Sequence, residues 1–493
     1  MQRSSAASAG HDYDIVIIGG GSAGLTAARV ALSLGARVAL VDKERLGGEC
    51  LWTGCVPSKS LIASARVAYQ TRRLADVGLQ GSLGTVDLGA VMDRVQGVIE
   101  TIDRGEDAAA MRKLGVDVRL GQARFRSPEA LEVDGETLRG RAYLICTGSR
   151  AAVPPIEGLQ GVDGVDYLTN ETVFGLRELP EHLVVAGGGP NGVEMAQAFR
   201  RLGSRVTVLA GDRGLMSGED REVADALHKV FAREGIAVVR AKLTGVRRDD
   251  AGVHVHYGGG EGGRGGDGGE VVGDRLLVAL GRRPNVEGLG LEQAGVSYDT
   301  RHGIVVDPYL QTSAARIFAC GDVTGPYRYT HAAGFQAATA VRNALLPRLR
   351  SRSRLAPMPW TTFTDPELAR VGLTEDEARR AHGDKVLVLR SLFEHVDRAQ
   401  AQGETEGFVK LIVSPWRGRI LGGHILGPRA GELIGEVTLA MRKGLSVSDL
   451  AGTIHVYPTL AMAVQQAALD YRRQAPLARL LNRPLRALVR HSS

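Results

Sequence analysis

Short apolar runs alternate with longer, alanine-rich stretches in the first part of the chain. Residues 14–18 (DIVII) form an apolar run of strand length, residues 25–34 are alanine-rich and helix-like, and residues 37–42 (RVALVD) form a second run that ends in an acid. A glycine-rich turn, GGGSAG at residues 19–24, joins the first run to the helix. The pattern predicts a strand, a helix and a strand in close succession, as in α/β folds.

The turn has the glycine spacing G-x-G-x-x-G, which is the fingerprint of dinucleotide-binding units. Gly19 permits the tight turn, Gly21 lets the backbone approach a pyrophosphate, and Gly24 lets the helix pack closely on the strand. Free N–H groups at the start of the helix face the phosphates. Asp42, at the end of the second strand, is placed to accept hydrogen bonds from an adenosine ribose. The segment is therefore predicted to bind a dinucleotide.

The same unit returns 168 residues further along the chain without a gap. Its apolar run covers residues 183–186 (LVVA), and Gly187, Gly189 and Gly192 occupy the three glycine positions. One chain thus carries two dinucleotide sites. In a redox protein this most simply means FAD plus a nicotinamide nucleotide.

One mismatch between the two units concerns the choice of nucleotide. Ala210 stands where the first unit has Asp42. An acid at this position holds the ribose 2′-OH of NAD and repels the 2′-phosphate of NADP. Ala210 removes that repulsion and Arg213 follows closely, so the sequence favours NADPH. Asp212 leaves NADH open, because it is able to serve a ribose.

Two of the four cysteines, Cys50 and Cys55, stand five positions apart in residues 47–59 (GGECLWTGCVPSK), directly after the first dinucleotide unit. A thiol pair beside a bound flavin can pass two electrons as a dithiol/disulfide couple. In a regular helix residues i and i+5 lie about 8–9 Å apart at Cα, whereas a disulfide tolerates at most ~7 Å. The pair can bridge only if the segment is not one regular helix, and Gly54 and Pro57 favour such a break.

The other two cysteines, Cys146 and Cys320, follow apolar strands and fit a packing role. No second cysteine or histidine pair stands near Cys50 and Cys55, so we expect no metal site. Residues 258–269 hold nine glycines in twelve positions and predict a flexible hairpin loop. From Trp360 onwards strands alternate with helices, which predicts a third, α+β domain without a nucleotide motif.

Composition is that of an ordinary soluble protein, with 44% hydrophobic and 24% charged residues. No apolar run is long enough for a membrane span, and residues 1–10 lack the apolar core of a signal peptide. Four cysteines in 493 residues do not make a secreted disulfide framework. A cytoplasmic location is expected.

The formal net charge of +6 is concentrated at the end of the chain. Six arginines and no acid follow Asp470, so the remainder is close to neutral. A nucleic-acid role needs a basic face on the folded part, and the charge count does not require one. The tail at residues 476–493 has leucines at nearly helical spacing, interrupted by Pro484. It fits weak membrane-surface contact, or a solvated or dimer-packed end.

Taken together, the motifs resemble those of the FAD-dependent pyridine nucleotide–disulfide oxidoreductases of class I, over roughly residues 12–470. The motifs that carry the resemblance are the two glycine fingerprints, the C-x(4)-C-V-P-S-K segment, TGS at 147–149, GRRPN at 281–285, CGDV at 320–323 and TDPELARVG at 364–372. The resemblance implies an α/β fold with two Rossmann-like dinucleotide-binding domains, for FAD and NAD(P), and a C-terminal α+β dimerisation domain. The expected boundaries are 1–155 and 282–355 for the FAD domain, 156–281 for the NAD(P) domain, 356–475 for the interface domain and 476–493 for the tail.

The resemblance also implies roles for single residues. Cys50 is the interchange thiol that faces substrate, and Cys55 is the thiol that stacks on the flavin. Lys59 lies near the flavin N5 and pairs with Glu194, and Asp322 binds the ribityl chain. The implied oligomer is a homodimer in which each C-terminal domain completes the partner's active site. The predicted cofactor-binding residues are Gly19, Gly21, Gly24, Asp42, Lys59, Thr147, Gly148, Asp322, Gly187, Gly189, Gly192, Arg213 and Gly281.

The C-terminal domain departs from the family pattern. Members that act on dithiols place a histidine directly before a proline, with a glutamate five residues later, to move the proton of the interchange thiol. Here Tyr457 and Met462 hold these positions. His455, two residues earlier, shares the side of Tyr457 on an extended backbone, so it is either a displaced base or a structural histidine. Mercuric reductases have tyrosine at the first position but also carry a C-terminal cysteine pair, which this sequence lacks.

The main hypothesis is an enzyme that takes hydride from NAD(P)H and passes electrons through FAD to the Cys50–Cys55 disulfide. From there they reach a small-molecule acceptor, which is a disulfide, a quinone or a metal ion, as in the mercuric reductase-like branch. One alternative is a dihydrolipoamide dehydrogenase that uses His455 as its base. Another is a redox-sensing flavoprotein whose thiol pair switches a partner.

Overall fold

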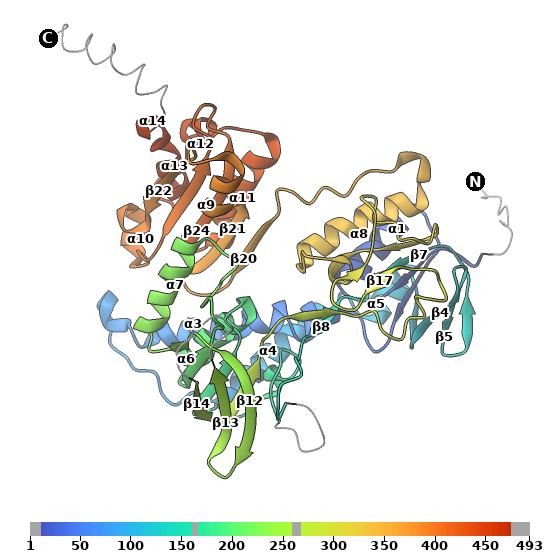
Figure 1. Cartoon of the computed structure of the whole chain (residues 1–493), viewed down its shortest axis with the longest axis horizontal. Helices are drawn as coiled ribbons and strands as arrows, with labels where there is room; N and C mark the ends of the chain where they lie inside the picture. Colours follow the sequence, from blue (N-terminus) through green and yellow to red (C-terminus); the bar gives the residue numbers. More distant parts are fainter. Residues whose placement is uncertain (1–10, 160–165, 259–267, 475–493) are drawn as a thin grey trace, which may run out of the picture.

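The computed structural model describes residues 11–159, 166–258 and 268–474 (Figure 1). Its larger sheets form two parallel, dinucleotide-binding-type units and one antiparallel unit in the C-terminal part. The predicted α/β fold class with a C-terminal α+β domain is therefore confirmed. The exact domain boundaries remain predictions.

The first sheet is parallel throughout and has the strand order β19-β7-β1-β2-β3. Its strands are β1 (Tyr13–Ile18), β2 (Val38–Asp42), β3 (Asp117–Leu120), β7 (Gly140–Ile145) and β19 (Ile317–Ala319). Helices α1 (Ser22–Ser33) and α8 (Thr330–Leu345) lie side by side against it, although they come from distant parts of the chain (Figure 1). Because parallel strands end at the same edge, the turns after β1, β7 and β19 meet there.

The continuous apolar pattern of β1 follows from burial on both faces of this sheet. Ile15, Val16 and Ile17 are each completely buried, as expected where helices cover one face and further strands cover the other. The second face packs against a small antiparallel sheet in the order β4-β5-β6. Its strands are β4 (Ala123–Ser127), β5 (Ala130–Val133) and β6 (Glu136–Leu138).

The second unit repeats the arrangement with a parallel sheet in the order β11-β10-β9-β15. Its strands are β9 (His182–Ala186), β10 (Arg205–Leu209), β11 (Ala237–Val239) and β15 (Arg275–Val278). The helices of this unit are α6 (Pro190–Leu202) and α7 (Arg221–Arg233). The offset between the glycine motifs in the sequence thus corresponds to two structural copies of one strand–turn–helix unit.

An antiparallel extension of three strands belongs to the second unit. Its sheet has the order β12-β13-β14, with β12 (Lys242–Asp249), β13 (Gly252–Gly258) and β14 (Gly269–Gly273). Strands β13 and β14 flank the glycine tract and pair with each other, as expected for a hairpin. Residues 259–267 of the tract lie outside the described residues.

The C-terminal unit is built on an antiparallel sheet in the order β20-β21-β24-β23-β22. Its strands are β20 (Pro359–Thr362), β21 (Glu367–Gly372), β22 (Leu387–Leu392), β23 (Phe408–Val413) and β24 (Ile420–Gly427). The helices of this unit are α9 (Glu375–His382), α10 (Asp397–Gln402), α11 (Ala430–Lys443), α12 (Val447–Gly452), α13 (Met462–Leu469) and α14 (Tyr471–Gln474). Residues 350–358, which have no regular structure, connect this unit to α8.

The chain between β2 and β3 of the first sheet contains the thiol segment. Its helices are α2 (Gly48–Trp52), α3 (Cys55–Thr71), α4 (Leu88–Asp103) and α5 (Ala108–Lys113), and the two cysteines lie on α2 and α3. Helix α3 packs against α6 of the second unit and against α4. The chain passes from the first unit to the second through β8 (Ser149–Ala151) and returns through β16 (Arg282–Pro284). These two short strands pair with each other in an antiparallel arrangement.

None of the described helices has both the length and the apolarity that a membrane crossing needs. The basic tail lies outside the described residues, apart from its approach through α14. The predicted membrane-surface contact of this tail therefore stays a prediction.

Candidate active site

A cavity of about 1370 Å³ opens between the two dinucleotide-binding units. Most of the predicted site residues line it: Gly19, Gly21, Asp42, Cys50, Cys55, Lys59, Thr147, Gly148, Gly187, Gly189, Glu194, Arg213, Gly281 and Asp322. Gly24 and Gly192 are not lining residues, because they lie where the helices pack against the turns. The cavity therefore joins the two glycine turns and the cysteine pair into one site.

The glycine turns fit two dinucleotides because a side chain has no room at the tight positions. Gly19 has φ of +104°, and a Cβ there would clash with the carbonyl of Cys146. A Cβ on Gly24 would clash with the carbonyl of Gly19. In the second unit Gly187 has φ of +130°, and a Cβ on Gly192 would clash with the Gly187 carbonyl. The two turns thus have the same steric design.

The middle glycines leave the backbone open to the cavity. A Cβ on Gly189 would meet nothing within 4 Å, so this position is open for a ligand and not for packing. A Cβ on Gly21 would meet only the Cα of Gly48, at 3.6 Å. These backbones can approach a pyrophosphate at the start of α1 and α6, where free N–H groups favour an anion.

The carboxylate of Asp42 is fixed at the end of β2. Its Oδ2 accepts a hydrogen bond of 2.7 Å from the N–H of Gly20, and its Oδ1 accepts one of 3.1 Å from the N–H of Glu44. The group lines the cavity at the edge of the first glycine turn. This placement suits the predicted contact with an adenosine ribose.

The thiol segment is not one continuous helix. Helix α2 contains Cys50 and ends at Trp52, and helix α3 begins at Cys55. Thr53 and Gly54 lie between them with non-helical backbone angles. The predicted break is therefore confirmed, and it brings the two sulfur atoms within reach of each other. Both cysteines are free thiols in this structure.

The two thiols differ in acidity because one stabilises the thiolate of the other. The hydrogen bond from Cys50, a contact of 3.6 Å with the Thr330 hydroxyl and the positive charge of Lys59 lower the pKa of Cys55 to about 6, although burial opposes this. The position of Cys55 at the N-terminus of α3 favours the same charge. The same hydrogen bond, together with burial, raises the pKa of Cys50. In the dithiol form Cys55 therefore ionises first.

Lys59 and Glu194 form an ion pair between α3 and α6. The Lys59 Nζ lies 2.8 Å from Oε2 of Glu194, whose side chain is only 4% exposed. The other oxygen, Oε1, accepts a hydrogen bond of 2.8 Å from the N–H of Phe363, and the ammonium lies 4.5 Å from the centre of the Phe363 ring. The predicted partners are thus in contact, and the contact fixes the ammonium at the cavity wall.

A second ion pair, between Glu49 and Arg282, was not predicted from the sequence. Glu49 directly precedes Cys50, and its carboxylate is ion-paired with the Arg282 guanidinium. It also accepts a hydrogen bond of 2.6 Å from the amide of Asn170. Burial raises the pKa of Glu49, although the hydrogen bond and charge of Arg282 oppose the rise. The first arginine of the GRRPN motif was the available signal, but the motif alone does not name its partner.

Arg282 also supports Asp322 through Ser149. The Nε of Arg282 donates a hydrogen bond of 2.8 Å to the Ser149 hydroxyl, which donates one of 2.7 Å to Oδ2 of Asp322. Asp322 lies in the turn after β19 and faces the cavity. The chain of contacts fixes this carboxylate at the cavity wall. Its contact with the ribityl chain stays a prediction.

The turns after β7 and β15 meet at the base of the cavity. Thr147 donates a hydrogen bond of 2.8 Å from its hydroxyl to the carbonyl of Asn285. Gly148 and Gly281 have φ of +70° and +119°, so both need the freedom of glycine. These residues shape the backbone of the site and have no acid–base group.

Arg213 lies in the loop after β10, close to Ala210, and both line the cavity. Asp212 forms an ion pair of 2.8 Å with Lys242, which also lines the cavity. The wall at the end of β10 therefore combines a small side chain with two cations. This is the region that contacts an adenosine ribose in a nucleotide bound to the second unit.

Tyr457 and His455 are not among the described residues that line the cavity with Cys50 and Cys55. The side chain of His455 is 7% exposed, with its Nε2 2.9 Å from Oε1 of Glu436 and its Nδ1 3.0 Å from the carbonyl of Thr453. Tyr457 is 65% exposed and donates a hydrogen bond of 2.8 Å to Asp397. The two side chains are thus held by different helices, His455 by Glu436 of α11 and Tyr457 by Asp397 of α10.

The exposed segment around Tyr457 is apolar. Ile454 is 95% and Val456 is 76% exposed in the single chain. An apolar strip of this kind marks a surface that another protein covers. Within the described residues, no group of three or more acidic, cysteine or histidine side chains is arranged to hold a metal ion.

Comparisons with known proteins agree with this architecture. The family model described as pyridine nucleotide-disulphide oxidoreductase matches residues 13–339, and the dimerisation-domain model of the same family matches residues 358–468. The latter match supports a homodimer.

Two curated relatives match over nearly their full lengths. A dihydrolipoyl dehydrogenase from Thermus scotoductus is 37% identical over 477 residues, which is 96% of this chain and 99% of the relative. A mercuric reductase from Streptomyces lividans is 38% identical over 469 residues, or 93% and 96% of the two chains.

Among solved structures, the HOCl-induced flavoprotein disulfide reductase RclA from Escherichia coli aligns with a TM-score of 0.81 and 30% identity, covering 93% of this chain and 99% of RclA. A Cu(II) complex of RclA aligns with a TM-score of 0.80 and 31% identity, covering 91% and 98%. The motifs, the cavity and these matches together show that the chain belongs to the class I pyridine nucleotide–disulfide oxidoreductases, which are FAD-dependent enzymes that use NAD(P)H.

Proposed function

We propose that this enzyme uses NADPH to reduce a soft metal ion through FAD and the Cys50–Cys55 pair. The proposal rests on His455 and Tyr457, the two C-terminal residues that would have to accept the proton of a dithiol substrate. Both ring nitrogens of His455 are engaged by Glu436 and Thr453, so the imidazole offers no free nitrogen to a substrate thiol. The position of the family histidine is held by a tyrosine instead.

Tyr457 is a weak base for such a proton transfer. The hydrogen bond to Asp397, and the negative charge of that carboxylate, raise the pKa of Tyr457 above its usual value. A phenol with a raised pKa stays protonated at neutral pH and acts as a hydrogen-bond donor. We propose that Tyr457, on the exposed apolar strip, faces the Cys50 thiol of the partner subunit across the dimer interface and contributes a donor there.

The chain's own residues divide the chemistry as follows. When bound by the residues that line the cavity, FAD would supply the hydride-accepting and two-electron chemistry that links the nicotinamide to the disulfide. Lys59, oriented by Glu194, supplies a fixed positive charge at the cavity wall. The Cys55 thiolate, stabilised at the start of α3, keeps its charge at neutral pH, and Cys50 holds the proton until a substrate replaces it.

A thiolate beside a second thiol is a good ligand for a soft cation. With Hg²⁺ as substrate, NADPH gives up two electrons and leaves NADP⁺ and one proton, and one Hg²⁺ takes both electrons to become Hg⁰. One relative and one structural neighbour support this class of acceptor: the relative is a mercuric reductase, and RclA has been solved as a Cu(II) complex.

The preference for NADPH rests on the wall at the end of β10. Ala210 presents no charge to a 2′-phosphate, and Arg213 is a cation at the same wall. Asp212, the acid that would serve a ribose of NADH, is paired with Lys242. We expect kcat/KM to be at least about tenfold higher with NADPH than with NADH, the range expected for one hydrogen bond to a charged group. A preference for NADH would overturn this assignment.

The acceptor is tested by anaerobic NADPH oxidation with Hg²⁺, Cu²⁺, a quinone, oxidised glutathione and lipoamide as separate substrates. We expect sustained turnover with a metal ion, and its loss in Cys50→Ser and Cys55→Ser enzymes that still bind FAD. Faster turnover with lipoamide would establish a dihydrolipoamide dehydrogenase, for which the 37% identical relative is the precedent. A single turnover with every acceptor would instead support a redox sensor.

A further inference from the structure

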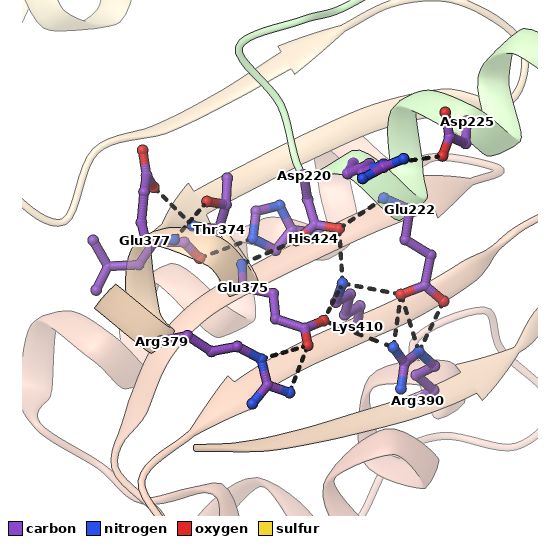
Figure 2. A network of polar contacts seen from close by, with 12 residues as sticks. Asp220, Glu222, Asp225, Thr374, Glu375, Glu377, Arg379, Arg390, Lys410 and His424 are labelled. Atoms are coloured by element: carbon purple, nitrogen blue, oxygen red, sulfur yellow. Dashed lines mark hydrogen bonds and ion pairs between the residues drawn. The ribbon is translucent and has the colours of Figure 1, made fainter. Parts of the chain in front are cut away.

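Lys410 of β23 is a buried lysine that joins the C-terminal unit to the second dinucleotide-binding unit. Its side chain is 2% exposed, and its ammonium is surrounded by three carboxylates (Figure 2). The Nζ lies 2.7 Å from Oδ1 of Asp220, 2.9 Å from Oε2 of Glu222 and 2.8 Å from Oε2 of Glu375. Asp220 and Glu222 belong to the start of α7, whereas Glu375 belongs to α9 of the C-terminal unit.

The surrounding charges keep this ammonium charged. Burial alone lowers the pKa of Lys410, but its hydrogen bonds to Asp220, Glu375 and Glu222 outweigh burial and raise the pKa. Arg390 and Arg379 neutralise the outer carboxylates, at 2.7 Å from Glu222 and 2.7 Å from Glu375 respectively (Figure 2).

The cap of α7 depends on this cluster. Asp220 is the N-cap residue, and its Oδ1 accepts a hydrogen bond of 3.2 Å from the N–H of Glu222. Its Oδ2 accepts one of 3.0 Å from the N–H of Glu375. His424 faces the same region, but burial lowers its pKa to about 4, so the imidazole is neutral at physiological pH.

The two residues before Asp220 are also held by the C-terminal unit. Arg370 donates a hydrogen bond of 2.8 Å to the carbonyl of Gly218. The indole N–H of Trp360 donates one of 2.7 Å to Oε1 of Glu219. Three consecutive residues, 218–220, are therefore anchored on β20, β21 and β23.

The anchored residues end the loop that begins after β10 and carries Arg213. At its other end, the N–H of Gly211 donates a hydrogen bond of 3.1 Å to the carbonyl of Ala241. In the middle, the N–H of Met216 donates one of 2.8 Å to the carbonyl of Gly188, in the second glycine turn. The conformation of the nucleotide-binding wall thus depends on contacts at both ends of the loop.

We propose that Lys410 is a positioning residue for NAD(P)H: through Asp220, the C-terminal unit sets the conformation of loop 211–220 and hence the affinity for the pyridine nucleotide. Lys410 does not line the main cavity, so its effect passes through the loop. Loss of its charge weakens nucleotide binding and leaves the delivery of electrons from FAD to the thiols unchanged.

The variants are Lys410→Met, which keeps the length of the side chain, and Asp220→Asn, which keeps the helix cap. The matched control is Arg390→Gln, because Arg390 contacts Glu222 and Glu375 at the exposed rim and not Asp220. Each FAD-loaded protein is examined by calorimetric titration with NADP⁺, by hydrogen exchange of peptides covering 211–220, and by thermal unfolding.

We expect Lys410→Met to weaken NADP⁺ binding about tenfold and Asp220→Asn about threefold, which is the usual size of such couplings. Peptides covering 211–220 exchange faster in both variants, and the Arg390→Gln enzyme stays within twofold of the parent. Unchanged NADP⁺ affinity in Lys410→Met, or equal losses in all three variants, would overturn the proposal. If Lys410→Met does not fold, the comparison of Asp220→Asn with Arg390→Gln decides.

Discussion

The ammonium of Lys59 lies 2.8 Å from the buried carboxylate of Glu194, although the two residues are 135 positions apart. The pair joins α3, which begins with Cys55, to α6, which begins at the second glycine turn. The ion pair therefore adds a charged contact to the packing of α3 against α6, which ties the thiol segment to the nucleotide-binding unit. Its removal affects both the stability of the protein and the charge beside the thiolate.

We expect Glu194→Gln to lower the free energy of unfolding by about 1–2 kcal/mol, because a hydrogen bond to a charged partner is replaced by a neutral one. Urea unfolding of the FAD-loaded protein measures this change. Glu132→Gln is the control, since Glu132 pairs with Arg126 on the surface and its loss has little effect. Equal stability of the Glu194→Gln enzyme and the parent would contradict the structural role of the pair.

The acidity of Cys55 predicts a pH dependence of alkylation in the reduced enzyme. Because its pKa is lowered to about 6, the thiolate dominates above that pH and is lost below it. The rate of reaction with iodoacetamide should therefore rise from pH 5 and level off near pH 7, measured by peptide mass spectrometry of the Cys55 site.

The same lowered pKa implies that Cys55 contributes stability as the pH rises from about 6 towards 9, which is its usual value. Cys50→Ala removes the hydrogen bond that stabilises the thiolate and should shift the alkylation profile to higher pH. A profile centred near pH 9 in the parent enzyme would show that the environment of Cys55 differs from the one described.

Arg282 should be needed for the affinity of FAD. Arg282→Leu leaves the buried carboxylate of Glu49 without its cation and removes the donor that holds Ser149 against Asp322. We expect the apparent Kd for FAD to rise about tenfold or more, since the loss of a buried charged partner costs well over 1 kcal/mol. Fluorescence titration of the apoprotein with FAD measures it.

Arg283→Leu is the control for this prediction, because Arg283 is the exposed neighbour of Arg282 in the same motif. A comparable rise in Kd with this control would show that the motif acts through its overall charge and not through Glu49.

Alanine substitutions at two glycines of the second turn should have different effects, one on protein stability and the other on nucleotide binding. Gly192→Ala forces a methyl group against the carbonyl of Gly187 and should destabilise the protein, by about 1–3 kcal/mol in the range of overpacking. Gly189→Ala has open space for its methyl group, so it should fold normally but raise KM for NADPH by blocking the approach of the pyrophosphate.

In Gly97→Ala the new methyl group meets nothing within 4 Å on α4, and we expect a gain of about 0.5–1 kcal/mol from helix propensity alone. Thermal unfolding and steady-state kinetics of the three variants test the pattern. Impaired folding of Gly189→Ala would mean that this position packs against protein.

Much of the site can be predicted from the sequence because it depends on local patterns of residues. The glycine spacings, the apolar strand runs and the position of Cys55 relative to Gly54 each fix a feature within a few residues of themselves. Glu49 and Arg282 are 233 positions apart, and nothing in either segment names the other. The same holds for Lys410 and its three carboxylates, which only the packing of two units brings together.

At His455 a local sequence pattern did not predict the structure. The alternation of side chains on an extended backbone predicts that it shares a side with Tyr457, but segment 453–458 is not an extended strand. Its conformation follows from contacts with α11 and α10, through Glu436 and Asp397. The alternation of side chains therefore does not apply to this segment, because its backbone is not a regular strand.

The break at Thr53 and Gly54 places the two sulfur atoms on two helices that differ greatly in length and burial. Helix α2 has five residues and buries only Leu51, whereas α3 has seventeen residues and six of them are buried. Forming a disulfide draws two contacting sulfur atoms together by about 1.5 Å. We expect the shorter and less buried helix to take up this shift, so that Cys55 keeps its position when the disulfide forms and Cys50 moves towards it.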